Sequence, residues 1–344
     1  MDNSIRLAII GFGTVGQGLA QILCRQQDLV VKGTTHKVLV TAVADQQFGV
    51  VENPQGLELT DLLKAAKERK SFSSISGYQA DWDSATLIKK ASADVLVELS
   101  YTNLSTGEPA SSYIRSALKR KLHVITTNKG PAALHFSELE ALAKENNVRF
   151  EVEGTVMSGT PAIRLGREIL SATGIKSIKG ILNGTTNFIL TRMEEGLSYE
   201  QALTQAQDAG YAEADPSGDV EGYDAAGKVV ILARLLFGKT IAMSDVGRKG
   251  ITGITQEDIQ QARLQSKRWK LIGMLTSDDR GELKASVKPT LLDINDPLAG
   301  VNGAVNAIQY YSQLLGQITL IGAGAGQTET AAAVMEDLSA IYRM

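Results

Sequence analysis

Two hydrophobic periods alternate along the first half of the chain. Residues 5–10 form an apolar run that stops at Gly11, which is typical of a strand buried on both faces. Similar runs predict further strands, and segments with apolar residues at helical spacing lie between them. The predicted strands cover residues 37–45, 94–100, 122–127 and 148–153, and the predicted helices cover 59–69, 84–91, 107–120 and 130–147. Short connections between alternating strands and helices indicate a parallel sheet with right-handed crossovers.

The second half of the chain mixes helices with longer strands. Residues 174–196 predict a strand, a tight polar turn and a helix, whose start carries Asn183, Thr185 and Asn187. Those polar groups would either cap the helix or form a wall of hydrogen-bonding groups for a small ligand. Another helix is closed by Gly210. A second sheet is predicted from the patterns at residues 177–182, 268–278, 281–289 and 304–312.

A glycine-rich turn follows the first strand. Gly11, Gly13 and Gly16 have the G-x-G-x-x-G spacing, with a strand before them and a helix to about Gln26 after them. The first glycine permits the turn, the second lets the backbone approach a pyrophosphate, and the third lets helix and sheet pack closely. The context predicts a Rossmann-type dinucleotide site, although such a turn also occurs in other α/β folds.

Asp45 ends the next predicted strand, 29 residues after Gly16 and later than the usual spacing of about 20. The insert at residues 27–36 explains the delay. An acid here suits a ribose 2′-hydroxyl and would repel a 2′-phosphate, which favours NAD over NADP, although Lys32 or Lys37 could still reach such a phosphate. The alternative is an ordinary acid at a strand end.

Composition excludes several classes of protein. Thirty-five basic and 38 acidic residues leave a net charge of −3, and the absence of a basic run with aromatics argues against nucleic-acid binding. We expect no signal peptide and no membrane span, and a single cysteine fits a cytoplasmic protein. Cys24, expected to pack inside the first helix, rules out a disulfide and a thiohemiacetal mechanism. The three histidines are widely spaced and indicate no zinc site, and only His123, at the start of a predicted strand, could lie near the cofactor. Lysines are the remaining acid–base candidates.

Six acids crowd residues 208–228, and the first base there is Lys228. The helix predicted from about Glu221 to Phe237 puts Asp224 and Lys228 four residues apart on one face. The apolar residues that follow Lys228 predict a buried helix, so the pair is more than a surface ion pair. Such a lysine can exchange a proton as an alcohol becomes an aldehyde, and the spare carboxylates suit a substrate ammonium. These residues predict a nicotinamide oxidoreductase that acts on a small amino-bearing alcohol or amine.

The same segment resembles the homoserine dehydrogenase family. The signature matches from Ala206 to Lys228, and residues 180–190 and 322–334 also look like the family's, so the resemblance covers nearly the whole chain. It implies reversible NAD(P)H-dependent reduction of L-aspartate 4-semialdehyde to L-homoserine, on the route to threonine and methionine. By resemblance, Lys228 donates the proton and Lys129 lies near nicotinamide and substrate. The substrate-binding set is Gly210, Glu213, Asp219, Asp224 and Thr185. The expected cofactor contacts are Gly11, Phe12, Gly13, Thr14, Val15, Gly16, Asp45, Thr102, Lys129, Gly324 and Gly326.

The family also carries a sodium-type monovalent cation. The matching positions are Glu153, Val156, Ser158 and Thr160. Hard cations take oxygen ligands, and mostly backbone carbonyls would serve here. This chain has Ser158 and Thr160 where the family pattern has glycine and a larger aliphatic residue, a change that carbonyl ligation tolerates.

The expected architecture has three parts: a Rossmann domain over residues 1–150, an α+β substrate and dimerisation domain over 151–310, and a return to the first domain over 311–344. The return would bring Gly324 and Gly326 to the cofactor. We expect no fused aspartate kinase, no C-terminal regulatory domain, and a homodimer formed through the free face of the second sheet. Two other functions stay open: a nucleotide-sensing Rossmann protein without catalysis and an amino-acid dehydrogenase that releases ammonia.

Overall fold

The computed structural model describes residues 4–31 and 33–343. Their contacts divide into two compact units. The first unit contains the described residues up to Gly159 together with those from Gly326 onward, and the second unit is Thr160–Ala325. In the part of the chain that the structure describes, no helix is long and apolar enough to cross a membrane.

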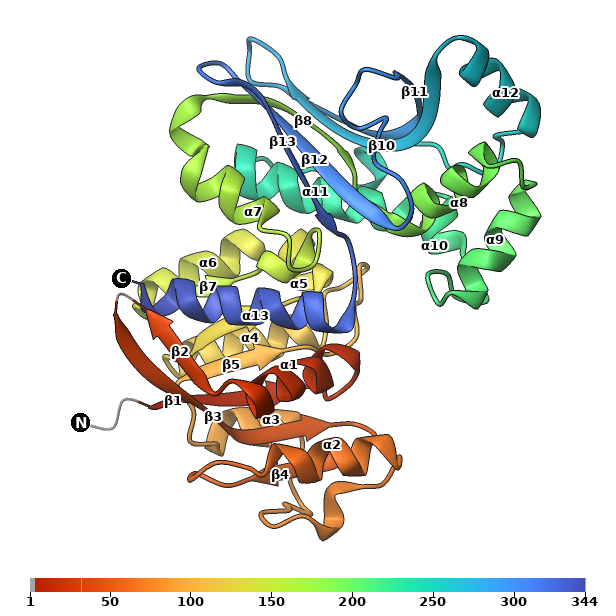
Figure 1. The fold of residues 1–344 in the computed structure, drawn as a ribbon. Coiled ribbons are helices and arrows are strands. Elements are labelled where there is room, and N and C mark those ends of the chain that lie inside the picture. The colour runs from red at the N-terminus through yellow and green to blue at the C-terminus, as the bar shows by residue number, and fades with distance from the viewer. Residues whose placement is uncertain (1–3, 32, 344) are drawn as a thin grey trace. The chain divides into compact units, whose positions relative to one another are not determined.

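The first unit is built on one seven-stranded sheet in the order β2-β3-β1-β5-β6-β7, with β4 paired to β3 (Figure 1). The strands from β3 to β7 along this order run parallel, as predicted. Leu7, Val97 and Ile125 on three central strands are fully buried, which accounts for their apolar runs. The strand bounds are β1 Ser4–Ile10, β2 Asp28–Val31, β3 Thr34–Asp45, β4 Gly49–Glu52, β5 Val95–Glu98, β6 His123–Thr126 and β7 Phe150–Glu151.

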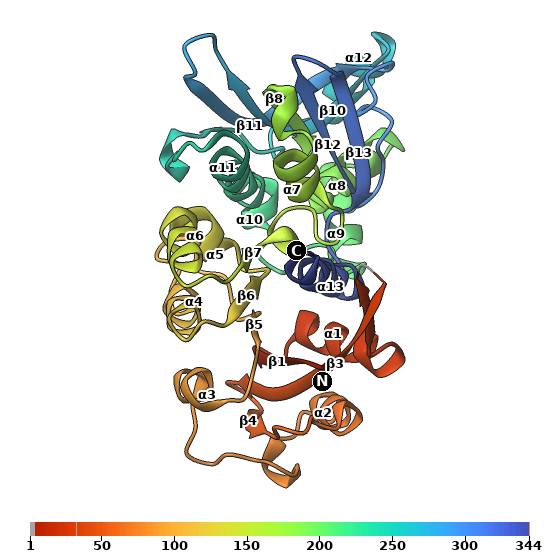
Figure 2. The ribbon, with the colours of Figure 1, turned by 90° about the vertical axis from the view of Figure 1, so that its left-hand side faces the viewer.

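Helices cover both faces of this sheet. In Figure 2, α3, α4 and α6 lie on one side of the strands, and α1, α2 and α13 lie on the other. Gly18 of α1 lies so close to α13 that a Cβ atom there would be 2.6 Å from the Gln327 carbonyl oxygen. The helix bounds are α1 Thr14–Arg25, α2 Leu59–Lys67, α3 Ser84–Lys90, α4 Ala110–Lys119, α5 Lys129–Leu134, α6 Phe136–Glu145 and α13 Gln327–Tyr342, with short 3-10 turns at Phe72–Ser74 and Glu153–Thr155. The parallel sheet with helices on both faces confirms the predicted Rossmann-type fold.

Four details of this unit differ from the sequence prediction. The insert before Asp45 forms a hairpin, in which β2 pairs antiparallel with the start of β3. The helix predicted over residues 130–147 is broken at His135, where the backbone leaves helical geometry between α5 and α6. The last strand is only two residues long, because the chain turns into a 3-10 helix at Glu153. Cys24 is exposed and is not a packing residue.

The second unit contains a six-stranded sheet in the order β13-β12-β8-β10-β11-β9. Apart from the short parallel pair of β11 and β9, its strands are antiparallel. The bounds are β8 Ile175–Ile181, β9 Gly247–Arg248, β10 Lys267–Ser277, β11 Leu283–Asp293, β12 Val305–Ser312 and β13 Gly316–Ala323. We expected the last strand to return to the first sheet with the final helix. Instead β13 pairs with β12 along its whole length, because the two form a hairpin around residues 313–315.

Two helices of the second unit pack on its sheet: α8 contacts β10 and β12, and α11 contacts β10 and β11. The central residues of α11, from Ala225 to Ala233, are all buried, which confirms the predicted buried helix. This helix begins at Tyr223 rather than at Glu221, because Gly222 before it has a left-handed backbone. The helix bounds are α7 Ala162–Arg164, α8 Gly184–Glu194, α9 Tyr199–Asp208, α10 Ser217–Val220, α11 Tyr223–Phe237 and α12 Gln256–Leu264, with shorter turns at Leu165–Ile169, Ser171–Thr173 and Met243–Asp245.

Candidate active site

The glycine-rich turn has the geometry that a dinucleotide requires. Gly11 has φ +92°, and a Cβ atom there would lie 2.5 Å from the Leu99 carbonyl oxygen. A Cβ atom on Gly13 would meet open space, whereas one on Gly16 would lie 2.6 Å from the Gly11 carbonyl oxygen. The α1 helix begins directly after, at Thr14. Open backbone in front of a helix N-terminus is a suitable site for a pyrophosphate.

Asp45 ties the end of β3 to this turn. Its Oδ2 accepts the backbone N–H of Phe12 at 2.7 Å, and its Oδ1 accepts the N–H groups of Gln47 and Phe48 at 2.8 and 3.3 Å. The Phe12 side chain is fully buried, so only its backbone is available to a ligand. Asp45 therefore orders the turn in addition to any contact with a ribose. Of the two alternative contacts for a 2′-phosphate, Lys32 lies outside the described residues and Lys37 is exposed on β3.

A buried carboxylate that the sequence analysis missed lies at the ends of β5 and β6. Glu98 is fully buried and accepts hydrogen bonds from the Ser100 backbone N–H at 2.8 Å, the Ser100 hydroxyl and the Thr126 hydroxyl at 2.8 Å. Burial raises the pKa of this carboxyl, and the hydrogen bonds from Ser100 and Thr126 oppose the shift. An acid at the carboxyl end of a predicted strand was the available signal, but only the tertiary structure brings Thr126 to it.

Asn128 joins this strand edge to Lys129. Its Oδ1 accepts the Gly130 N–H at 3.0 Å and so caps α5, of which Lys129 is the first residue. Its Nδ2 donates to the carbonyl oxygens of Ser100 and Tyr101 at 3.2 and 3.0 Å. Asn128 therefore holds the start of α5 against the loop that carries the exposed Thr102. Lys129 itself is partly buried.

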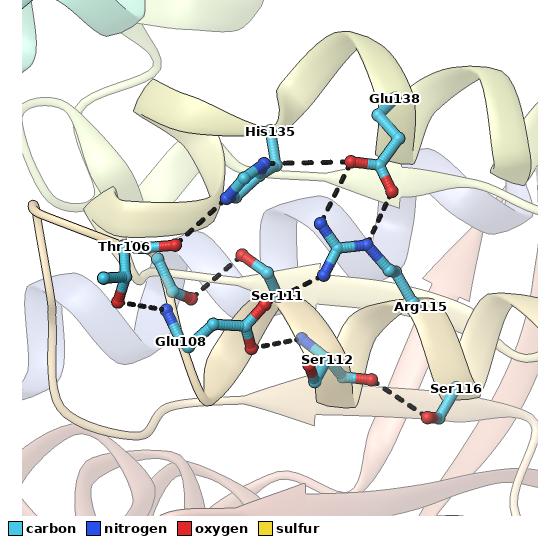
Figure 3. Close-up of polar contacts among 9 residues, drawn as sticks. Thr106, Glu108, Ser111, Ser112, Arg115, Ser116, His135 and Glu138 are labelled. Carbon is cyan, nitrogen blue, oxygen red and sulfur yellow. Dashed lines mark hydrogen bonds and ion pairs between the residues drawn. The ribbon is translucent and has the colours of Figure 1, made fainter.

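A second polar network anchors the far end of that loop (Figure 3). Arg115 of α4 binds Glu108 at 2.9 Å and Glu138 at 2.5 Å, and His135 Nε2 lies 3.0 Å from the Thr106 carbonyl oxygen. The hydrogen bonds that the Arg115 guanidinium donates to the two carboxylates raise its pKa, with Glu138 as the larger cause. The loop is thus fixed to α4 on one side and to the α5–α6 junction on the other, which explains the break in the predicted helix.

In the second unit, Lys228 is the centre of a compact polar cluster. Its side chain is 8% exposed, and its Nζ lies 2.8 Å from Asp224 Oδ2, four residues earlier on α11. The same Nζ donates to the Leu182 carbonyl oxygen at 2.6 Å, where β8 leads into α8. The aspartate–lysine pair predicted from the sequence therefore exists, and it is more enclosed than a surface ion pair, since its lysine is buried and its aspartate is 22% exposed.

Asn183 connects this pair to a further acid. Its Nδ2 donates to Asp219 Oδ1 at 2.6 Å and to Asp224 Oδ2 at 3.1 Å, while its Oδ1 caps α8 through the Thr186 N–H at 2.9 Å. Burial raises the pKa of the Asp219 carboxyl, and the nearby Asp224 adds to this, against the opposing effects of Asn183 and Lys228. The structure thus brings together Asp219, Asp224 and Lys228, which lie ten residues or fewer apart in the sequence. We call these residues and Asn183 the lysine cluster.

The other expected substrate residues lie on the segment before α10. Gly210 is exposed with φ +73°, and Glu213 is exposed. Thr185 of α8 donates to the Tyr211 carbonyl oxygen at 2.6 Å, which tethers this segment to the start of α8. In the described part of the chain, the Glu213 carboxylate makes no hydrogen bond or ion pair with the lysine cluster. An exposed carboxylate of this kind is free to meet a cation from solvent.

The four candidate cation ligands are all buried, between 0% and 8% exposed. Met157 and Ser158 have positive φ values of 61° and 54°, so the chain turns sharply here. The Ser158 hydroxyl lies 2.7 Å from the Thr330 hydroxyl, and the Thr160 hydroxyl donates to the Ala323 carbonyl oxygen at 3.0 Å. With both hydroxyls engaged, backbone carbonyls are the natural ligands at these positions, and that donor type fits a hard cation. Over residues 4–31 and 33–343, no cluster of three or more His, Cys, Asp or Glu residues could hold a metal ion.

The two expected C-terminal glycines stand in tight surroundings. A Cβ atom on Gly324 would lie 2.2 Å from the Asn306 side chain, and Gly326, with φ +141°, precedes α13. Asn306 is fully buried, and neither polar atom of its amide has a hydrogen-bond partner in the region that the structure describes. Sequence reasoning missed this residue, because an asparagine within a strand pattern carries no distinguishing signal.

Comparison with known proteins gives one consistent result. A family model described as homoserine dehydrogenase matches residues 161–339, and the homoserine dehydrogenase NAD-binding domain matches residues 11–153. An NAD(+)-dependent homoserine dehydrogenase of Pseudomonas canavaninivorans is 46% identical over 98% of this chain and 96% of its own. A homoserine dehydrogenase of Methanocaldococcus jannaschii is 41% identical over 98% of each chain.

The solved structures that resemble this chain are also homoserine dehydrogenases. A hyperthermophilic archaeal homoserine dehydrogenase in complex with NADPH has a TM-score of 0.83 at 31% identity, covering 98% of this chain and 97% of its own. The enzyme from Thiobacillus denitrificans has a TM-score of 0.82 at 31% identity, covering 99% of this chain and 73% of its own. With a Rossmann unit, a buried lysine paired with an aspartate, and relatives along nearly its whole length, the chain belongs to the homoserine dehydrogenase family of NAD(P)-dependent oxidoreductases.

Proposed function

We propose that Lys228 is the general acid and base in the interconversion of L-aspartate 4-semialdehyde and L-homoserine. Aldehyde reduction places negative charge on the carbonyl oxygen, and an ammonium beside that oxygen stabilises the charge and supplies the proton. The observation that carries this proposal is the burial of Lys228 against Asp224 and the Leu182 carbonyl. Those two contacts hold the Nζ atom in place and leave it a third N–H to donate.

The acids of the lysine cluster would bind the substrate's ammonium. Lys228 carries one positive charge, whereas Asp219 and Asp224 can carry two negative charges between them. Asn183 holds both aspartates through one amide nitrogen. Glu213 and the exposed backbone at Gly210 would complete the substrate site, and Thr185 would hold their segment in place through Tyr211.

The first unit would hold the cofactor. When bound, NAD or NADP supplies the nicotinamide that gives or takes the hydride. The open backbone at Gly13 and the start of α1 at Thr14 and Val15 would receive the pyrophosphate. Lys129 and Thr102, which Asn128 holds together, would lie along the nicotinamide half, and Gly326, directly before α13, would allow close approach. Gly324, a residue of the second unit, is the one expected cofactor contact outside the first unit.

We further propose that the enzyme prefers NAD over NADP. Asp45 stands at the end of β3, where a 2′-phosphate would meet its negative charge. The Pseudomonas canavaninivorans relative is named as NAD(+)-dependent, whereas the archaeal structure holds NADPH. Both relatives match this chain along nearly its whole length but are named with different cofactors, so likeness to them does not decide between NAD and NADP. The negative charge at position 45 is therefore the stronger argument.

Three further properties belong to this proposal. Backbone carbonyls of Glu153, Val156, Ser158 and Thr160 would hold a sodium-type cation, which their burial and oxygen chemistry support. A homodimer would cover the exposed Tyr311, Leu314, Leu315 and Ile321 on and beside the β12–β13 hairpin. The enzyme would act in the cytoplasm, in threonine and methionine biosynthesis.

One assay tests the reaction and its alternatives together. Purified protein is given L-homoserine with NAD or NADP, and reduced nicotinamide is followed by absorbance while ammonia is measured in parallel. The proposal predicts reduced nicotinamide without ammonia, and faster turnover at low concentrations of NAD than of NADP. Release of ammonia would indicate an amino-acid dehydrogenase, and no turnover with either cofactor would indicate a nucleotide-sensing protein.

A further inference from the structure

A short segment of the second unit lies against the turn between α10 and α11. We call residues 247–252 the strap, and the turn consists of Val220–Gly222. Asp219 comes directly before this turn, and Asp224 lies two residues after it. Both acids belong to the lysine cluster, so the backbone of the turn fixes the points from which their side chains extend.

The strap is anchored to the sheet of the second unit. Its first two residues form β9, which pairs with β11. The Lys249 N–H donates to the Val287 carbonyl oxygen at 2.8 Å, and Ile251 is fully buried. These contacts do not involve the turn, so the strap is held in place independently of the turn that it contacts.

Three groups of the strap bind the turn. The Ile251 N–H donates to the Val220 carbonyl oxygen at 2.8 Å. Arg248 Nη1 donates to the Glu221 carbonyl oxygen at 2.5 Å, and the Thr252 hydroxyl donates to Glu221 Oε1 at 3.0 Å. The strap therefore binds two successive backbone carbonyls of the turn together with its one charged side chain.

Gly250 is the point at which the strap and the turn are closest. A Cβ atom on Gly250 would lie 2.3 Å from the Val220 carbonyl oxygen and 2.7 Å from the Glu221 Cα atom. Both are backbone atoms, which cannot rotate aside as the end of a side chain can. The φ angle of Gly250 is not positive, so its own backbone would accept another residue. The nearness of the turn is what requires a glycine here.

We propose that the strap positions Asp219 and Asp224 for the substrate's ammonium, and that Gly250 is a positioning residue for the reaction. The Asn183 amide nitrogen donates to Asp219 at 2.6 Å and to Asp224 at 3.1 Å, which holds the two carboxylates together at their ends. The turn sets the distance between them at the backbone. Since small displacements of binding groups are costly, a shift of the turn would weaken the ammonium site. The inference rests on the proposed function, because it requires these acids to bind homoserine.

Two glycines of neighbouring sequence provide a matched test. Gly250→Ala adds one methyl group against the turn and must displace the turn or the strap. Gly253→Ala is the control, because a Cβ atom on Gly253 would meet nothing within 4 Å and its φ is not positive. Neither change removes a polar group. The kcat and the KM values for homoserine and NAD are measured, and 4-hydroxybutanoate, which is homoserine without its amino group, is measured as a competitive inhibitor.

We expect Gly250→Ala to raise the homoserine KM by at least about tenfold. The NAD KM and the inhibition constant of 4-hydroxybutanoate should stay within about twofold, because neither ligand uses the ammonium site. A general disturbance of the unit would instead weaken homoserine and 4-hydroxybutanoate alike. All of these constants should stay within about twofold in Gly253→Ala.

Arg248→Met serves if Gly250→Ala does not fold. Arg248 is exposed, and the change removes its hydrogen bond to the Glu221 carbonyl and the stacking of its guanidinium 3.5 Å from the centre of the Tyr223 ring. The homoserine KM should rise by about fivefold or more. Arg192→Met is the matched control: Arg192 also lies over an aromatic ring, that of Phe188 at 4.9 Å, but on α8 rather than at the turn, so the KM should stay within about twofold.

A homoserine KM within about twofold of the wild type in folded Gly250→Ala would overturn the inference. So would an equal rise in Gly253→Ala, or an equal loss of affinity for 4-hydroxybutanoate. The same comparisons apply to Arg248→Met and its control. A wild type that oxidises homoserine while its Gly250→Ala variant is unaffected would refute the role of the strap alone, whereas a wild type that does not oxidise homoserine would refute the proposed function and this inference with it.

Discussion

Lys228→Met removes the proton and the charge but keeps most of the side-chain volume. In the folded protein it leaves Asp224 and Asp219 sharing Asn183 without their neighbouring cation. Removing one partner of a buried ion pair typically costs about 3–5 kcal/mol. Asp224 is 22% exposed and can be solvated in part, so we expect a loss of unfolding free energy near the lower end, about 3 kcal/mol.

The effect of Lys228→Met on catalysis should be larger than its effect on stability, and the two can be measured separately. General acid catalysis contributes about 10²–10⁴-fold, and the lost electrostatic stabilisation adds to it. We expect kcat to fall by at least about 10³-fold, which is about 4 kcal/mol of activation free energy. NAD binding, followed by quenching of protein fluorescence, should stay within about twofold, because the expected cofactor contacts lie elsewhere in the sequence.

A matched variant separates stability from catalysis. Lys179 on β8 pairs with Asp296 in the same unit, and the two side chains are 24% and 21% exposed. Lys179→Met should lower thermal stability as well, but its kcat should stay within about twofold of the wild type. Steady-state kinetics and thermal unfolding of both variants decide the matter. A folded Lys228→Met protein with kcat within about tenfold of the wild type would refute the lysine mechanism and make Lys129 the leading candidate.

Three further predictions concern other parts of the molecule. Asp45→Ala should narrow the preference for NAD over NADP, mainly through the cofactor KM; a wild type that clearly prefers NADP would contradict the argument. Glu213→Gln should raise the homoserine KM by one to two decades, since a charge-assisted hydrogen bond is worth roughly 1.5–3 kcal/mol, and an unchanged KM would rule out its role. Burial lowers the pKa of Lys270 to about 8, so the folded state holds fewer protons than the unfolded chain between pH 8 and about 10.5. Unfolding free energy should therefore rise with pH across that window, and Lys270→Met should remove this rise; equal slopes in urea titrations of the two proteins would contradict the burial argument.

Local patterns in the sequence determined the class of the first unit's fold and the central contact of the candidate active site. The apolar run ending at Gly11 and the glycine spacing after it predicted the Rossmann sheet. A parallel strand that is buried on both faces has apolar residues at nearly every position, and such a run is visible in the sequence. The spacing of Asp224 and Lys228 predicted their contact, because residues four apart in a helix lie about one turn apart on the same face. The apolar residues after Lys228 also predicted a buried helix, and the structure has Lys228 and the residues that follow it buried.

Only the tertiary structure decided contacts between distant residues. Asn183 meets Asp219 and Asp224 across 36 and 41 residues, and Glu98 meets Thr126 across 28. The same holds for β13, whose apolar pattern fits either sheet and whose pairing with β12 was decided by the hairpin. Residue type and spacing carry information about neighbours along the chain. The partner of a buried polar group depends instead on which strands and helices pack together, and a hydrophobic pattern does not encode that choice.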